Sequence, residues 1–216
     1  MTDGGPSGRG WRRVHPRLII VTDTTVAPEG VIEPRIERAL ALARPAMVMV
    51  QLRDTALSVR RRLALGERLL AICRRHGQLL VVNDRVDLAV LLGADGVHLG
   101  EASIASEDAR KLLSPGAWIS RACHAPSEVA HTDADAALLS PIAAPRKGRA
   151  ALGLAALSEA RARRGSASPL LYALGGIDAE SAARCVARGA AGVAVIGAVL
   201  DGRDPEPLVR ALGIVR

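Results

Sequence analysis

Aromatic residues are almost absent from this 216-residue chain, which has no Phe, two Trp and one Tyr. A surface that binds nucleic acid by base stacking needs several aromatic side chains. The formal charge of +7 comes mostly from arginines spread along predicted helices, an arrangement typical of solvated helix faces. We therefore expect no nucleic-acid partner, and we attribute the positive charge to attraction of small phosphorylated molecules.

Cysteine and long apolar runs are also scarce. Cys73, Cys123 and Cys185 lie far apart and form no CxxC pair, which argues against a disulfide framework and against a zinc site. No apolar run reaches the roughly 18 residues of a membrane span, and the N-terminus lacks the apolar core of a signal peptide. These absences predict a cytoplasmic protein without a membrane partner.

What the chain has in abundance is Leu, Ala and Val, within a hydrophobic share of 49%. Its length suits one closed α/β barrel, which usually has about 200 to 250 residues. The Gly-rich, basic residues 1–13 are expected to form a disordered tail. We therefore expect a single barrel domain over residues 14–216.

Residues 79–99 show the unit from which the chain is built. An apolar run over 79–82 ends at the polar group Asn83, Asp84 and Arg85, and a helical pattern over 86–92 stops at Gly93. A second apolar run then covers residues 96–99. Strands that are apolar on both faces belong to a parallel sheet covered on both sides, so this is a β-α-β unit.

The same pattern predicts eight strands and eight helices. The strands lie at residues 17–25, 46–54, 79–82, 96–99, 118–124, 136–142, 170–177 and 192–200, and the helices at 32–43, 59–76, 86–92, 105–113, 126–131, 152–164, 179–188 and 205–212. An open doubly wound sheet is one alternative. Polar or Gly-rich ends after nearly every strand favour a single (β/α)8 TIM barrel, in which those ends meet at one mouth.

Two glycine-containing segments suit a phosphate group. Gly175 and Gly176 end the seventh predicted strand, and Ile196 and Gly197 lie within the end of the eighth. Barrels of this class often bind phosphate through backbone N–H groups at these two strand ends. Tight turn packing is the alternative explanation for either pair, but the two pairs together favour phosphate binding.

Among the five histidines, His124 is the candidate for proton transfer. It follows the fifth predicted strand and is expected to face the mouth, and an ordinary imidazole titrates near neutral pH. His98 lies inside the fourth strand, where we expect a hydrogen-bonded core histidine.

Five further polar residues follow the second, third and sixth strands: Gln51, Arg53, Asn83, Asp84 and Lys147. Gln51 is a candidate for substrate binding. Arg53 and Lys147 are suited to an anion, and Asn83 is suited to a ring nitrogen or an amide. Asp84 is suited either to Mg²⁺ or to a salt bridge with Arg85 or Arg53.

Several motifs occur in an order that resembles the thiamine phosphate synthase/TenI family. They are QLRD from Gln51, NDRVDLA from Asn83, GADGVHLG from Gly93, the histidine after the fifth strand, ALGGI from Ala173 and GVAVIGAV from Gly192. The resemblance covers residues 17–200 and implies a TIM barrel in thiamine biosynthesis. The synthase joins hydroxymethylpyrimidine diphosphate to thiazole phosphate with Mg²⁺, whereas the TenI branch aromatises a thiazole carboxylate tautomer with a histidine like His124.

Four departures from the synthase pattern affect its diphosphate subsite. Thr55 stands where the pattern has Lys, Glu101-Ala102-Ser103 where it has a metal-binding Asp, Ala122 where it has Ser, and Ala143-Ala144-Pro145-Arg146 where it has a Thr-rich loop. Glu101 and Arg146 are candidates for partial replacement of the lost groups. The losses favour a TenI-like tautomerase that needs no cofactor.

The synthase with Mg²⁺ is the alternative function, and a non-catalytic regulator that binds thiazole or thiamine phosphates is a second alternative. All three interpretations share a small phosphorylated thiazole-type or thiamine-type ligand. A homo-oligomer is compatible with the sequence.

Overall fold

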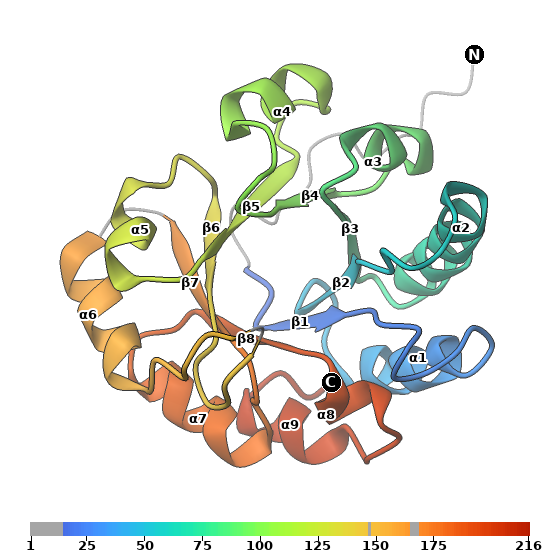
Figure 1. Ribbon diagram of the computed structural model, residues 1–216. Helices are drawn as coiled ribbons and strands as arrows, with labels where there is room; N and C mark the ends of the chain where they lie inside the picture. Colours follow the sequence, from blue (N-terminus) through green and yellow to red (C-terminus); the bar gives the residue numbers. More distant parts are fainter. Residues whose placement is uncertain (1–14, 147, 165–168) are drawn as a thin grey trace.

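The computed structural model describes residues 15–146, 148–164 and 169–216. Eight parallel strands follow one another around a closed barrel, and helices surround the strands (Figure 1). The ring closes where β1 pairs with β8, with Leu18 beside Val193 and Ile20 beside Val195. This closure confirms the predicted (β/α)8 barrel and contradicts the open sheet. The predicted tail over residues 1–13 lies outside the described residues.

Each strand is four to six residues long. The strands are β1 Leu18–Val21, β2 Val48–Leu52, β3 Leu79–Asn83, β4 Gly96–Leu99, β5 Trp118–Cys123, β6 Ala136–Leu139, β7 Leu170–Leu174 and β8 Gly192–Val195. Most of them end earlier than predicted, because the polar residues at their carboxyl ends leave the ladder and enter the loops. The sequence pattern therefore overestimated strand length at the end where the loops carry the polar side chains.

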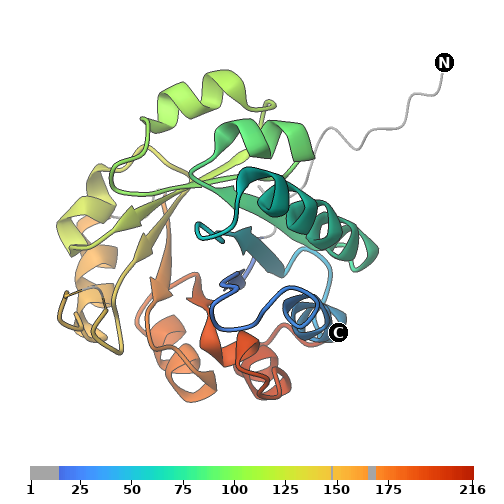
Figure 2. The same ribbon diagram turned by 45° about the vertical axis from the view of Figure 1, so that its right-hand side comes forward.

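The helices cover the outside of the barrel (Figure 2). They are α1 Ile32–Leu42, α2 Val59–Arg75, α3 Val86–Leu92, α4 Ser106–Leu112, α5 Pro126–His131, α6 Ala155–Arg164, α7 Ala179–Ala187, α8 Gly197–Leu200 and α9 Glu206–Ala211. Ser58 caps α2 by accepting a hydrogen bond from the Arg61 N–H, and Gly93 ends α3 in the left-handed conformation, both as predicted.

The prediction for the eighth strand was wrong beyond Val195. Ile196 leaves the strand conformation, and Gly197–Leu200 forms the short helix α8, in which the Leu200 N–H bonds the Ile196 carbonyl at 2.9 Å. Val199 and Leu200 are buried, and α8 contacts α1. An apolar run of this kind does not distinguish a buried strand from a buried helical turn, so the pattern alone could not reveal α8.

Two of the three aromatic side chains close the amino end of the barrel. Trp118 and Tyr172 are fully buried and meet edge to face, with ring centroids 6.1 Å apart. The Tyr172 hydroxyl donates a hydrogen bond of 2.6 Å to the carbonyl of Pro16, directly before β1. With the amino end filled in this way, the carboxyl ends of the strands are the open side of the barrel.

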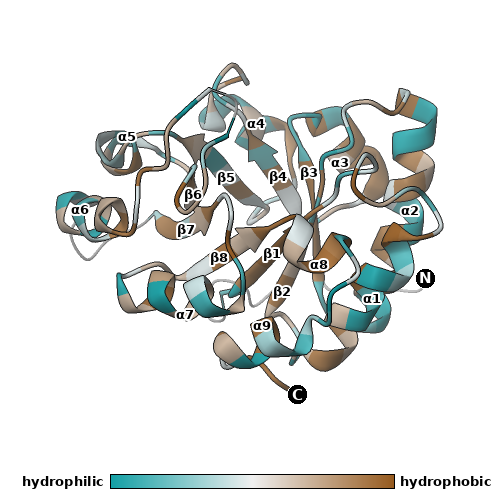
Figure 3. Ribbon diagram, turned by 60° about the horizontal axis from the view of Figure 1, so that its bottom comes forward, coloured by the Kyte–Doolittle hydropathy of each residue, from teal (hydrophilic) through white to brown (hydrophobic). Residues whose placement is uncertain are grey.

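The hydropathy of the elements follows their place in the barrel. In Figure 3, β1 is hydrophobic along its length, whereas α2 mixes hydrophilic and hydrophobic residues. Buried positions of α2, such as Leu65 and Leu69, pack against the strands. No helix among the described residues has the length and apolar character needed to cross a membrane.

Candidate functional site

The carboxyl ends of the strands surround a cavity of about 560 Å³. Its walls include Gln51, Arg53, Asn83 and His124, which come from β2, β3 and the loops after β2 and β5. The rule that parallel strands end at one edge therefore brings together four of the predicted site residues. The cavity lies within the usual size range of small-molecule sites, about 300 to 1,000 Å³.

Two amide side chains form a pair on one wall. Gln51 Nε2 donates a hydrogen bond of 3.0 Å to Asn83 Oδ1, and Gln51 itself is almost fully buried. The bond fixes both amide groups, and it leaves Gln51 Oε1 and both N–H groups of Asn83 unused by it. The pair thus offers an acceptor and a donor side by side.

Arg53 is held by a carboxylate that the sequence analysis did not assign. Arg53 Nη2 lies 2.5 Å from Asp23 Oδ2, and both side chains are largely buried. Burial raises the pKa of Asp23, but hydrogen bonds from Thr25 and the attraction of Arg53 outweigh this, so the pKa lies below its usual value. Asp23 is therefore ionised, and its partner Arg53 is fixed in the cavity wall.

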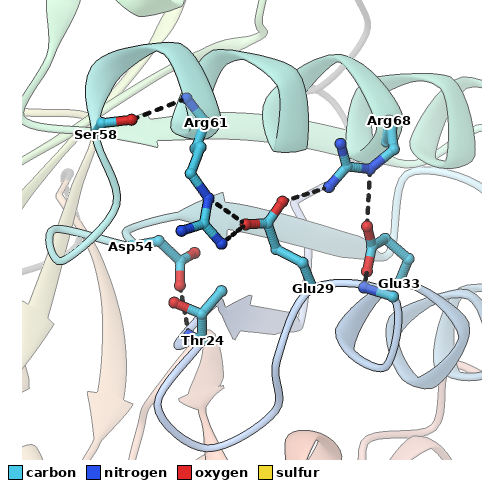
Figure 4. A network of polar contacts seen from close by, with 8 residues as sticks. Thr24, Glu29, Glu33, Asp54, Ser58, Arg61 and Arg68 are labelled. Atoms are coloured by element: carbon cyan, nitrogen blue, oxygen red, sulfur yellow. Dashed lines mark hydrogen bonds and ion pairs between the residues drawn. The ribbon is translucent and has the colours of Figure 1, made fainter.

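The loop after β1 is fastened to β2 and α2. Asp54 accepts hydrogen bonds from the Thr22 hydroxyl and, at 2.5 Å, from the Thr24 N–H. Farther along the loop, Glu29 bonds Arg61 and Arg68 of α2, as Figure 4 shows. These contacts hold the loop that carries Asp23 against the mouth.

His124 lines the cavity and has one ring nitrogen bound to a carbonyl and the other near a carboxylate. Nδ1 lies 2.9 Å from the Ser140 carbonyl oxygen, and Nε2 lies 3.8 Å from Glu101 Oε2. Because a carbonyl can only accept, Nδ1 carries the proton in the neutral ring, and Nε2 has a free lone pair. This geometry suits the predicted role of His124 in proton transfer.

His98 is the core histidine that was expected, and it also contributes to the cavity wall. Its side chain is buried, and Nδ1 lies 3.0 Å from the Ser120 hydroxyl. Burial, followed by the positive charges of Arg121 and Arg53, lowers the pKa of His98 to about 4. His98 is therefore neutral at physiological pH.

Asp84, the predicted Mg²⁺ ligand, is bonded to a hydroxyl group. The Ser103 hydroxyl donates a hydrogen bond to Asp84, and the Gly100 N–H donates one to Ser103 at 2.7 Å. Among the described residues no cluster of three or more His, Cys, Asp and Glu side chains could hold a metal. Octahedral Mg²⁺ is normally held by carboxylates and phosphates, and here one carboxylate faces a neutral hydroxyl.

Asp84 forms neither of its two predicted salt bridges. Arg85 binds Asp87 at 2.5 Å, and Arg53 binds Asp23. Asp84 has a positive φ of 64°, which turns its side chain toward the loop after β4. Local sequence order suggested Arg85 as the partner, but this backbone conformation directs the carboxylate elsewhere.

The departures from the synthase pattern lie in the cavity wall. Thr55, Ala122, Glu101 and Arg146 all line it, and so does Arg149. Arg149 Nη2 lies 2.9 Å from Glu101 Oε2, so Glu101 binds an arginine rather than joining Asp84. The predicted anion-binding residue Lys147 lies outside the described residues.

The predicted phosphate-binding segments lie beside the cavity rather than in its lining. Leu174, directly before Gly175, and Val21 of β1 both line it, and β8 lies between these two strands. Gly175 and Gly176 have φ values of 106° and 71°. A Cβ on Gly176 would lie 2.6 Å from Ala144 Cβ, so turn packing alone requires glycine there.

Gly197 differs from this pair. A Cβ on Gly197 would meet no atom closer than 4.0 Å, so packing does not explain the glycine. Gly197 opens α8, whose first N–H groups have no partner within the helix. Phosphate binding at the four residues thus stays a prediction.

The chain is similar to thiamine phosphate synthases over most of its length. A family model described as thiamine monophosphate synthase matches residues 18–199. The thiamine-phosphate synthase of Thermus thermophilus is 41% identical over 183 residues, covering 82% of this chain and 85% of the relative. That of Chlorobium luteolum is 36% identical over 203 residues, covering 91% of each.

A solved structure shows the same similarity. Thiamine phosphate pyrophosphorylase from Pyrococcus furiosus superposes with a TM-score of 0.75 at 26% identity, covering 91% of this chain and 95% of that one. An orotidine 5'-phosphate decarboxylase from Pyrococcus horikoshii, at 13% identity and a TM-score of 0.59, shares only the fold.

Proposed function

Because the chain belongs to the thiamine phosphate synthase family, we propose that it joins hydroxymethylpyrimidine diphosphate to thiazole phosphate and releases diphosphate. The similarity to relatives that carry the synthase name supports this function ahead of the tautomerase that the four departures had favoured. In the reaction, the thiazole nitrogen forms a bond to the pyrimidine methylene carbon. The bond from that carbon to the diphosphate oxygen breaks, and its electron pair leaves with diphosphate.

The observation that carries the proposal is the amide pair of Gln51 and Asn83. Its remaining acceptor and donor complement the amino group and the adjacent ring nitrogen of the pyrimidine. The loop after β1 and the buried Arg53 lie next to the pair and suit the diphosphate arm. We place the thiazole phosphate at Gly175, Gly176, Ile196 and Gly197, where backbone N–H groups can approach an anion.

The assay for this function incubates purified protein with the two substrates, and mass spectrometry detects thiamine phosphate. In Gln51→Leu, loss of the amide should reduce kcat/KM for the pyrimidine substrate by about ten- to a hundredfold, because a buried partner is left unsatisfied. The KM for the thiazole phosphate should stay within about twofold. Absence of product at high enzyme concentration, with and without Mg²⁺, contradicts the proposal.

A thiazole tautomerase is the second candidate function, and the geometry of His124 favours it. Nδ1 is fixed by the Ser140 carbonyl, and Nε2, 3.8 Å from Glu101 Oε2, keeps a lone pair in the neutral ring. Such a ring can remove a proton from one carbon of the thiazole carboxylate tautomer and return a proton to a second carbon, which leaves the aromatic ring. Incubation with the tautomer tests this, and turnover that His124→Ala leaves unchanged excludes His124 from the mechanism.

Assay of both reactions on one preparation separates the candidates. Thiamine phosphate formation supports the synthase, and aromatisation alone supports the tautomerase. Calorimetric binding of thiazole phosphate without either turnover supports the non-catalytic regulator.

A further inference from the structure

The position expected to hold a second metal-binding carboxylate holds a hydroxyl. Of the three residues Glu101, Ala102 and Ser103, it is Ser103 that contacts Asp84, and its hydroxyl donates to that carboxylate. Glu101 points to Arg149 instead, at 2.9 Å. Asp84 therefore has a neutral partner where the synthase pattern has a second metal-binding carboxylate, so at most one carboxylate is available to a divalent cation here.

Arginine side chains supply positive charge to the wall of the same cavity. Arg53, Arg146 and Arg149 all line it, whereas Thr55 supplies no charge. Arg53 pairs with Asp23 and Arg149 with Glu101. The Arg146 guanidinium forms no hydrogen bond within the described part of the chain, yet it is near enough to act electrostatically on both Asp23 and Arg53.

A bound diphosphate can replace Glu101 as the partner of Arg149. Both side chains are substantially exposed, with 69% of Glu101 and 42% of Arg149 accessible to solvent. An exposed ion pair contributes only about 0 to 1 kcal/mol. A diphosphate offers several anionic oxygens and can bind a guanidinium through two parallel hydrogen bonds, so it competes well with the single carboxylate of Glu101.

We propose that Arg149 and Arg146, together with Arg53, neutralise the bound diphosphate in place of Mg²⁺, so that this chain binds diphosphate without a divalent cation. Glu101 holds Arg149 at the mouth until the diphosphate replaces it. This inference rests on the proposed function, because that function brings a diphosphate into the cavity.

The first test measures binding of inorganic diphosphate to the wild-type protein by calorimetry, once in EDTA and once in MgCl₂. We expect binding in EDTA that is at least as tight as in MgCl₂. Binding that is lost in EDTA and restored by MgCl₂ would overturn the inference.

Three variants test the arginines in EDTA. Arg149→Gln should weaken diphosphate binding by about tenfold, since it removes one charge-assisted contact. Glu101→Gln should tighten it by about two- to fivefold, because the competing carboxylate is gone. The control is Arg163→Gln on α6, which breaks a comparable exposed pair with Glu159 at 2.9 Å and should change nothing.

Equal affinity in Arg149→Gln, Glu101→Gln and wild type contradicts the role of this pair. Failure of the proposed function is distinguishable from this result. Diphosphate binding in EDTA without formation of thiamine phosphate leaves the inference standing and removes the synthase activity. Thiamine phosphate formed only with Mg²⁺, together with Mg²⁺-dependent diphosphate binding, keeps the synthase and removes the inference.

Discussion

Because His98 is buried in its neutral form, it makes the free energy of unfolding depend on pH. Its pKa in the folded protein is about 4, against 6.5 for an ordinary histidine. Between these values the unfolded chain binds a proton that the folded protein excludes. The stability that depends on neutral His98 is therefore complete above pH 6.5 and is lost progressively as the pH falls toward 4.

This predicts a smaller acid sensitivity for His98→Gln. Urea unfolding at pH 7 and pH 4.5 should show a smaller decrease in the free energy of unfolding for the variant than for wild type. His131→Gln, at the exposed end of α5, is the control and should retain the wild-type decrease. Equal decreases in wild type and His98→Gln would contradict the assignment.

Ser103 offers a direct test of the proposal that Mg²⁺ is not needed at Asp84. In Ser103→Asp a carboxylate replaces the hydroxyl beside Asp84, and two adjacent carboxylates attract a divalent cation. We expect MgCl₂ to raise the Tm of the variant but not that of wild type, because a ligand of the folded state stabilises it. Ser127→Asp on α5 adds the same charge at a residue that does not line the cavity, and this variant should not respond to Mg²⁺.

The sequence predicted some of the individual site residues and missed others for a physical reason. Gln51, Arg53, Asn83 and His124 follow from the rule that parallel strands end at one mouth. The Ser103 contact with Asp84 depends on loop conformation and on a positive φ in a non-glycine residue, which strand patterns do not encode. The same holds for Asp23 beside Arg53.

The turns after β7 and β8 contribute to stability and to the predicted phosphate site in ways that two glycine variants can separate. Gly176 has a positive φ and is tightly packed against Ala144, whereas Gly197 has open space at its Cβ position. Gly176→Ala should lower the free energy of unfolding by about 1–2 kcal/mol or more, since alanine is strained in the left-handed region. Urea unfolding measures this loss.

Gly197→Ala should leave stability nearly unchanged, because alanine favours the helix that this residue opens. If α8 contributes N–H groups to a phosphate, the added methyl group should weaken binding of thiazole phosphate by calorimetry. Unchanged affinity in a stable Gly197→Ala protein would remove α8 from the phosphate site.

One helix cap and one glycine stop were predicted correctly from the sequence. Ser58 at the start of α2 and Gly93 at the end of α3 took the expected roles. The capping box of Asp178 and Ser181 at α7 follows the same chemistry and was not recognised in the sequence. The helix α8 was hidden because its apolar residues continue those of β8.

For the molecule as a whole, three buried thiols report on cooperativity. Cys73 lies on α2, Cys123 on β5 and Cys185 on α7. Burial raises the pKa to about 12 for Cys73 and Cys123 and to about 11 for Cys185. Because the thiolate is the reactive form, alkylation of the folded protein should be slow at all three.

In increasing denaturant the three thiols should become reactive together, as one barrel core unfolds as a unit. Alkylation followed by peptide mass spectrometry gives the rate for each cysteine. A cysteine that reacts well before the other two would show that its part of the barrel opens separately.

The fold itself was predictable because eight repetitions of one pattern agree with one another. Each apolar strand is followed by a helix, nearly every strand has a polar or Gly-rich end, and a closed ring satisfies all eight units at once. The edge pairing of β1 with β8 is the feature that no local pattern specifies. Strand and helix patterns do not distinguish a synthase from a tautomerase, because one fold can carry several functions.

The pairing of β1 with β8 also brings the two ends of the described chain to one place. The Arg17 N–H bonds the Met47 carbonyl, and the Arg44 N–H bonds the Ile214 carbonyl, each at 2.9 Å, so both ends are tied to the turn before β2. A circular permutant with these ends joined by a linker, and cut in the exposed segment 114–116 before β5, would keep every interstrand ladder. The order in which the strands are synthesised is thus separable from their order around the ring.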